Sequence, residues 1–250
     1  MTNTSIPSAS DLLKFRAKRF IVSQSERADR LSLARQDVEG LTTPRARRLS
    51  KSGDVFVLQN PAKISAAQFV AANADEAELD IGDALKRDDA VDRKNAKPRY
   101  AWKVPVHRPP DAEEEDIAAR SDALVTVDSH GTPVGFLSID VCIGRAGRSW
   151  ILDFDLPYLF VAKRVRGKGF GLALQVAVEE FSRAVYERIA LELPTNHQLA
   201  CTVSADYASK EGERSALGVL EELMYVREVM LEDDEGAVCG LGEIEIDAGY

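Results

Sequence analysis

Hydrophobic and polar positions follow regular patterns mainly in the second half of the chain. The segments ALVTV and VGFLSIDVCI, separated by a turn at Ser129-His130-Gly131, predict a β-hairpin. After the turn GRAG, the mostly apolar run WILDFDLPYLFVA predicts a long strand, and apolar residues then recur with a helical period over GFGLALQVAVEEFSRAVYERI. The segment LACTV predicts a buried strand, ASKEGERSALGVLEELM a further helix, and YVREVML with AVCGLGEIEI two closing antiparallel strands.

The first half of the chain carries a weaker pattern. Ser8, followed by Asp11, resembles a capping box and predicts a helix that continues to Phe20. Residues 26–38 predict a second helix, and the segment TTPRARRLSKSG predicts a linker. The segment DVFVLQ, residues 54–59, predicts a short strand, and the Asn-Pro pair after it predicts the start of a helix over PAKISAAQFVAANA.

Composition excludes several classes of protein. The chain has 250 residues, of which 45% are hydrophobic, as in an ordinary globular protein. No run approaches the roughly 18 apolar residues of a membrane-spanning helix, and the N-terminus lacks the apolar region of a secretory signal. The 3 cysteines are too few and too far apart for a disulfide framework or a cysteine-rich zinc site. We therefore expect a cytoplasmic protein without a metal.

The net charge of −9 hides an asymmetry along the chain. Residues 1–51 carry a balance of +6, and the remainder carries −15. A basic arm on an acidic body can contact nucleic acid or a partner protein, or it can be a helix that packs on its own body. We favour packing, because acidic residues are interleaved with the basic ones from Glu26 onward.

The glycine-rich turn between the long strand and the long helix is the most informative stretch. Its glycines allow a ligand to approach the backbone closely, and the N–H groups and dipole of the following helix start favour an anion. Arg166 and Lys168 add positive charge, so the turn predicts a pyrophosphate site. It is not a Walker A loop, which needs Lys followed by Ser or Thr, nor a dinucleotide fingerprint, because Leu172 stands where a third glycine is required. The glycines are Gly167, Gly169 and Gly171.

This segment resembles the signature of the GNAT N-acetyltransferase superfamily, Arg/Gln-x-x-Gly-x-Gly/Ala, which is met here by Arg166, Gly169 and Gly171. The expected order of hairpin, long strand, helix, strand, helix and final hairpin, over about residues 122–246, is similar to the family core. The resemblance implies a mixed α/β (α+β) fold in which a central twisted sheet is flanked by helices. Residues 52–250 would form this domain, and residues 1–51 would be a basic helical N-terminal extension with its linker.

The resemblance also implies acetyl-CoA as co-substrate. Backbone groups at the end of the long strand would pair with the pantetheine arm like an added strand, and backbone N–H groups of the turn would receive the pyrophosphate. Pro157 cannot donate to a ladder, which fits a place where two parallel strands splay apart to admit the cofactor, or a plain bulge. The expected cofactor-binding residues are Leu159, Phe160, Val161, Arg166, Gly167, Lys168, Gly169, Phe170, Gly171 and Leu172.

Family chemistry is direct attack of an amine on the thioester, which needs a base and an acid. Asp153 and Asp155 lie two residues apart on the long strand, and therefore on one face, where several family members place a carboxylate base. Each could instead point only to solvent. Tyr207 is the nearest candidate for the acid and Tyr225 the second, because Leu220 stands where family members often carry a Tyr, and Met224-Tyr225 replaces the Gly-Phe that follows it.

These observations predict an acetyl-CoA-dependent N-acetyltransferase that acts on a primary amine, either of a cationic small molecule or of a protein or peptide. The alternative is a catalytically silent acyl-CoA-binding or interaction module of the same fold. A homodimer stays open, as does contact of the basic arm with nucleic acid or protein. Cys142 and Cys201 lie in apolar strands, and we expect them to be inert core residues.

Overall fold

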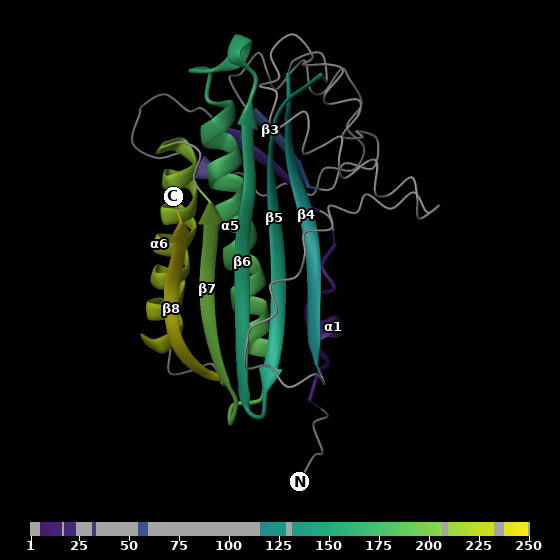
Figure 1. The fold of residues 1–250 in the computed structure, drawn as a ribbon, viewed down its shortest axis with the longest axis vertical. Coiled ribbons are helices and arrows are strands. Elements are labelled where there is room, and N and C mark those ends of the chain that lie inside the picture. Colours follow the sequence, from purple (N-terminus) through teal and green to yellow (C-terminus); the bar gives the residue numbers. More distant parts are fainter. Residues whose placement is uncertain are drawn as a thin grey trace, which may run out of the picture.

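A single mixed sheet organises the part of the chain that the structure, a computed structural model, describes: residues 6–16, 18–23, 32–33, 55–59, 116–128, 132–206, 210–232 and 238–249. The strand order is β2-β1-β3-β4-β5-β6-β7-β8 (Figure 1). Neighbours from β2 to β6 pair antiparallel, whereas β6, β7 and β8 pair in parallel. The strands are β1 (Arg19–Ser23), β2 (Ser32–Leu33), β3 (Val55–Gln59), β4 (Ile117–Val127), β5 (Pro133–Ala146), β6 (Ser149–Val161), β7 (Gln198–Asp206) and β8 (Gly240–Gly249).

The two long helices, α5 (Phe170–Glu192) and α6 (Lys210–Glu232), pack on the same face of this sheet, behind the strands in Figure 1. Alternate residues of β6 supply the centre of the core, since Trp150, Leu152 and Phe154 are fully buried beneath these helices. The chain therefore has a mixed α/β fold with a mostly antiparallel open sheet. None of the helices in the described ranges combines the length and apolarity needed to span a membrane.

The N-terminal segment contradicts the prediction of a helix that continues to Phe20. Ser8 does cap a helix, because its Oγ accepts a hydrogen bond from the Asp11 backbone N–H at 3.2 Å. That helix, α1 (Ala9–Leu12), is only one turn long. Phe20 lies in β1, paired with Val57 of β3, so pairing with a neighbouring strand overrides the local helical pattern.

Two arginines hold the backbone that follows α1. Arg120 of β4 donates from Nη1 to the carbonyl oxygens of Leu13 and Phe15, at 3.2 and 2.9 Å. Arg188 of α5 donates to the carbonyl oxygen of Lys14 at 2.7 Å, and both guanidinium groups lie over the Phe15 ring. These carbonyl groups accept hydrogen bonds from arginine side chains rather than from helical backbone N–H groups, which gives a physical reason why α1 ends. The described part of the arm is packed on the body, as we favoured.

Two further expectations about helices and strands are wrong. Residues 32 and 33 form β2 rather than part of a helix over 26–38, whose remainder lies outside the described residues. The expected closing hairpin is absent from the described ranges, because residues 225–231 continue α6 and only β8 follows, parallel to β7. Val226 and Met230 recur at helical spacing and pack on the core, and Arg227 donates to the Gly242 carbonyl oxygen at 2.6 Å.

Most of the remaining expectations for the second half are confirmed. The β4–β5 hairpin, the long strand β6, the helix α5, the buried strand β7 and the start of α6 all lie where the patterns predicted them, although β4 begins earlier, at Ile117. The short strand before Asn60 is β3. The helix expected after Asn60 lies outside the described residues, and the division of the chain at residue 51 stays a prediction.

Candidate active site

The strand β6 pairs along most of its length with β5 but along only half of its length with β7. The parallel register with β7 runs from Ser149↔Gln198 to Asp155↔Ser204. Beyond Asp155, β6 continues to Val161 and keeps β5 as its neighbour, with Val161 opposite Gly135. Among the described strands, β7 does not continue alongside residues 156–161, and a ligand could pair with this edge of β6 as an added strand would.

A β-bulge marks the point where this edge opens. Asp155 lies opposite Asp140 and Tyr158 lies opposite Ser138, so two residues of β6, one of them Pro157, face a single residue of β5. An extra residue of this kind bends the strand and increases its twist. The strand therefore bulges at Pro157, and its pairing with β7 ends two residues earlier, at Asp155; admission of a cofactor at this place stays a prediction.

The glycine-rich turn continues directly from this open edge. A short 3-10 helix, η1 (Lys163–Val165), leads into the turn, where Gly167 and Gly169 have φ values of 75° and 85°. Only glycine adopts such angles without strain. Arg166 donates from Nε to the Val161 carbonyl oxygen at 3.0 Å, and this bond ties the turn to the last residue of β6. Arg166 and Lys168 are both exposed, so their charge faces solvent beside the turn.

The helix α5 begins immediately after the turn with a glycine as its cap. Gly169 has no side chain to accept hydrogen bonds from the first-turn amides, which are those of Phe170, Gly171 and Leu172. Those N–H groups and the helix dipole therefore favour an anion at this end. Packing against the described residues does not require Gly171, because among them a Cβ there would meet only Val161 Cγ2, at the ordinary contact distance of 3.6 Å.

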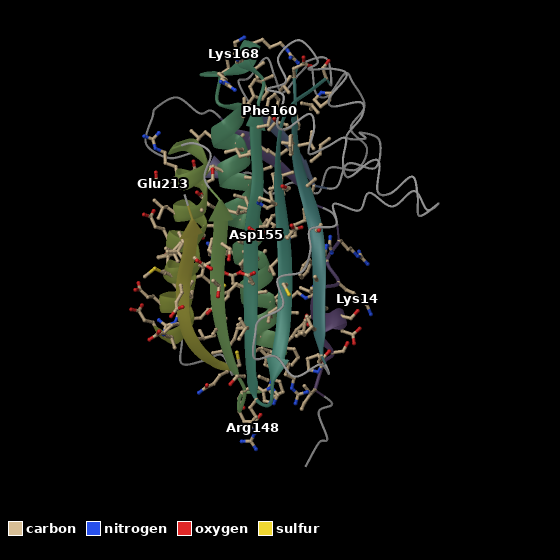
Figure 2. All side chains as sticks on the ribbon, in the orientation of Figure 1. Lys14, Arg148, Asp155, Phe160, Lys168 and Glu213 are labelled. Atoms are coloured by element: carbon tan, nitrogen blue, oxygen red, sulfur yellow. The ribbon has the colours of Figure 1, made fainter. Side chains whose placement is uncertain are left out.

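Asp153 and Asp155 lie on the face of β6 opposite the helices, because the residues between and beside them point into the core. Both side chains are half-buried, and Figure 2 labels Asp155 near the middle of the sheet. Ser204 of β7 donates from Oγ to Asp153 Oδ1 at 3.1 Å. The two carboxylates thus share one face, as their spacing predicted, and Asp155 stands at the register position where the open edge begins.

The structure brings the expected cofactor-binding residues together in one continuous region: the open half of β6, the turn and the first turn of α5. At about 3.3 Å per residue, the strand separates Asp155 from Val161 by roughly 20 Å. A ligand with an anionic end at α5 and a linear arm along residues 156–161 would bring its far end to Asp155. Tyr207, the expected acid, lies outside the described residues.

Sequence reasoning missed Asp140 and Ser138 of β5, which lie beside the bulge. They are on the same sheet face as Asp155, and Asp140 is directly opposite it. Only cross-strand register brings these residues together. The alternation within VGFLSIDVCI indicates which residues share a face, but it does not name the residues across from them.

The cysteines near the site are not poised as nucleophiles. Cys142, opposite Asp153, has its pKa raised to about 11 by burial and by the carboxylate charge. Burial likewise raises the pKa of the Cys201 thiol, again with a contribution from Asp153. A thiol with a raised pKa is a weak nucleophile at neutral pH. In the described ranges no three histidines, cysteines or carboxylates gather in a way that could hold a metal ion.

Comparisons of the chain with protein-family models, with curated proteins and with solved structures found no match.

Proposed function

We propose that the chain is an acetyl-CoA-dependent N-acetyltransferase of the GNAT type that acetylates a primary amine. The observation that carries the proposal is the edge of β6. Its pairing with β7 stops at Asp155↔Ser204, and the six residues that follow lead straight into a glycine turn at a helix start. A linear ligand with a pyrophosphate at one end matches both parts, since backbone groups receive its arm and first-turn amides receive its phosphates.

The residues present fit acetyl-CoA in three respects. Val161 and the two residues before it offer the backbone edge for the pantetheine amides. The first-turn amides of α5, with Gly169 as a cap that lacks a side chain, offer donors for the pyrophosphate. Arg166 and Lys168 add charge at the rim. The acetyl group of a ligand held in this way would reach the bulge beside Asp155.

Asp155 and Asp153 are the chain's candidate groups for handling the proton of the incoming ammonium. One carboxylate accepts a proton from the ammonium, and the nitrogen lone pair then forms the N–C bond with the thioester carbonyl carbon. As the C–S bond breaks, the sulfur takes up a second proton from the nitrogen. The products are the amide, the free thiol of CoA and one released proton.

The fold also departs from the family pattern that the motif resembles. The family core ends in a hairpin, whereas in the described residues after α6 one strand follows, β8, which is parallel to β7. This departure leaves the second candidate in place, a silent acyl-CoA-binding module of the same fold. The cysteines are free thiols, which is typical of a reducing compartment, and we infer that the protein acts in the cytoplasm.

The test measures acetyl-CoA binding by calorimetry and free-thiol release with a panel of amines. We expect binding, and turnover with at least one primary amine. Asp155→Asn should lower kcat by about 10²-fold or more, the usual contribution of a general base, while the Kd for acetyl-CoA changes little. Asp153→Asn shows whether the second carboxylate also contributes to turnover. The matched control is Glu221→Gln, which removes one negative charge from the exposed surface of α6.

Thiol release separates the two candidates, acetyl-CoA binding tests both of them, and Asp155→Asn tests the base. Binding without thiol release from any amine would favour the silent module. Absence of acetyl-CoA binding would contradict both candidates. Equal losses of affinity and turnover in Asp155→Asn would show that Asp155 is not the base.

A further inference from the structure

The sheet face opposite α5 and α6 carries carboxylates in two neighbouring rows that cross the strands. In the first row, Asp140 of β5, Asp155 of β6, Ser204 of β7 and Asp247 of β8 lie side by side in register. The second row contains Asp153, Thr202 and Glu245 on β6, β7 and β8. On this face of β4 to β8, no position whose side chain the structure describes is a lysine or an arginine.

These carboxylates form two clusters with β7 between them. Asp140, Asp153 and Asp155 form the inner cluster, and Glu245 and Asp247, both exposed on the edge strand β8, form the outer cluster. Adjacent strands lie about 4.8 Å apart, so β6 and β8 are separated by about 10 Å. Only hydroxyl side chains occupy the β7 positions in between. Asp140 and Asp155 lie directly opposite one another, and a cation placed between two facing carboxylates lowers their mutual repulsion.

A buried hydroxyl beside the inner cluster independently indicates a ligand. Ser138 is only 2% exposed, and its Oγ has no hydrogen-bond partner among the described residues. It lies on the same sheet face, two residues from Asp140, and opposite the bulge in β6. A buried hydroxyl without a partner costs about 1–3 kcal/mol, so such groups call for an explanation. An ammonium group bound between Ser138 and Asp140 would supply the missing partner.

We propose that the acceptor is a linear polyamine that lies across β6, β7 and β8. One terminal ammonium binds at the inner cluster with the Ser138 hydroxyl as an additional acceptor, and this nitrogen is the one acetylated. A second ammonium, about 10 Å away, binds Glu245 and Asp247. A lysine side chain carries a single cation and would leave the outer cluster unused, whereas a polyamine uses both. This inference rests on the proposed acetyltransferase function and names its substrate class.

The test varies the distance between the two cations of the acceptor. An extended chain of single bonds gains about 1.2 Å per bond, so the nitrogens of diaminoheptane reach about 10 Å apart and those of diaminopropane only about 5 Å. We expect calorimetry to detect spermidine and diaminoheptane binding to the full chain, and their KM in thiol release to be at least about tenfold below that of diaminopropane, equivalent to about 1.4 kcal/mol.

The double variant Glu245→Gln/Asp247→Asn should raise the KM for spermidine and diaminoheptane about tenfold and bring it close to that for diaminopropane. Acetyl-CoA affinity and the KM for diaminopropane should not change. The matched control Glu221→Gln/Glu228→Gln removes the same charge from the exposed side of α6 and should leave every value unchanged. Ser138→Ala tests the inner cluster, and it should weaken all amines alike while leaving folding intact by circular dichroism.

Three outcomes would overturn the inference: no dependence on chain length, equal effects of the two double variants, or turnover with a lysine peptide but not with polyamines. In the third case acetyl-CoA binding and thiol release remain, so the proposed function stands while its substrate class fails. Loss of acetyl-CoA binding by the unaltered chain would instead contradict the proposed function.

Discussion

Gly171 is the residue at which helix stability and the proposed acetyl-CoA binding favour different side chains. It lies in the first turn of α5, where alanine stabilises a helix relative to glycine by up to about 1 kcal/mol. Within the described ranges, a new Cβ would contact Val161 Cγ2 alone, at 3.6 Å. Gly171→Ala should therefore unfold at an equal or slightly higher urea concentration, yet bind acetyl-CoA at least about tenfold more weakly, because the methyl group occupies the space of close approach.

A matched control for this variant is Gly147→Ala, in the turn between β5 and β6. Gly147 has a φ of 63° and open space around it, so alanine there strains the backbone by about 1–2 kcal/mol without touching the glycine-rich turn. That variant should lose stability and keep its acetyl-CoA affinity. If Gly171→Ala binds acetyl-CoA as tightly as the unaltered chain, the pyrophosphate does not lie against this helix start.

At the scale of elements, a buried ion pair connects β3, β4 and the segment after α1. Asp122 is fully buried and accepts from Arg120 Nε and Nη2, at 2.7 and 2.8 Å, and from Gln59 Nε2 at 2.8 Å. The same Arg120 holds the carbonyl groups of Leu13 and Phe15. One side-chain cluster therefore joins parts of the chain that lie more than a hundred residues apart in sequence.

Asp122→Ala should lower the free energy of unfolding by about 3–5 kcal/mol, because it leaves Arg120 partly buried without its partner. Urea denaturation followed by circular dichroism measures this loss. Glu192→Gln, which removes the exposed partner of Arg188, should change stability little. A small effect of Asp122→Ala would mean that Arg120 and its neighbours rearrange and that the cluster does not hold these elements together.

The elements also show how far the sequence alone could be read. A helical period located α5, and a long, mostly apolar run located β6. The local pattern misassigned residues 225–231, where valines favour a strand locally but the apolar side chains at helical spacing find the core. It also extended α1 too far, because the arginines that take the carbonyl groups of Leu13, Lys14 and Phe15 come from β4 and α5.

On the scale of the whole molecule, the described part of the basic N-terminal arm belongs to the same hydrophobic core as the body. Leu12, Leu13 and Phe20 are at most 5% exposed and lie in the cluster that includes α5 and α6. The charge asymmetry of the sequence thus does not imply a separate tail in this region. These buried apolar residues cannot contact nucleic acid, so any such contact would have to come from exposed basic residues of the arm.

Leu12→Ala should therefore destabilise the entire chain by about 2–5 kcal/mol, as expected for a fully buried leucine. The unfolding transition, followed both by far-ultraviolet circular dichroism and by tryptophan fluorescence, should stay single and shift as a unit. Lys14→Ala, an exposed change two residues away, is the control and should leave the transition in place. A separate low-stability transition, with the main one unshifted, would show that the arm folds independently of the body.

The sequence by itself determined the strand-turn-helix unit, the glycine positions in its turn and the pair of aspartates on one strand face. These features depend on local geometry: positive φ values need glycine, and the alternation along a strand places residues i and i+2 on one side. Only the tertiary structure decided where β6 parts from β7 and that Asp140 lies opposite Asp155. It also decided that Glu245 and Asp247 share their face. Cross-strand register arises from the packing of distant segments, and no local pattern in the chain encodes it.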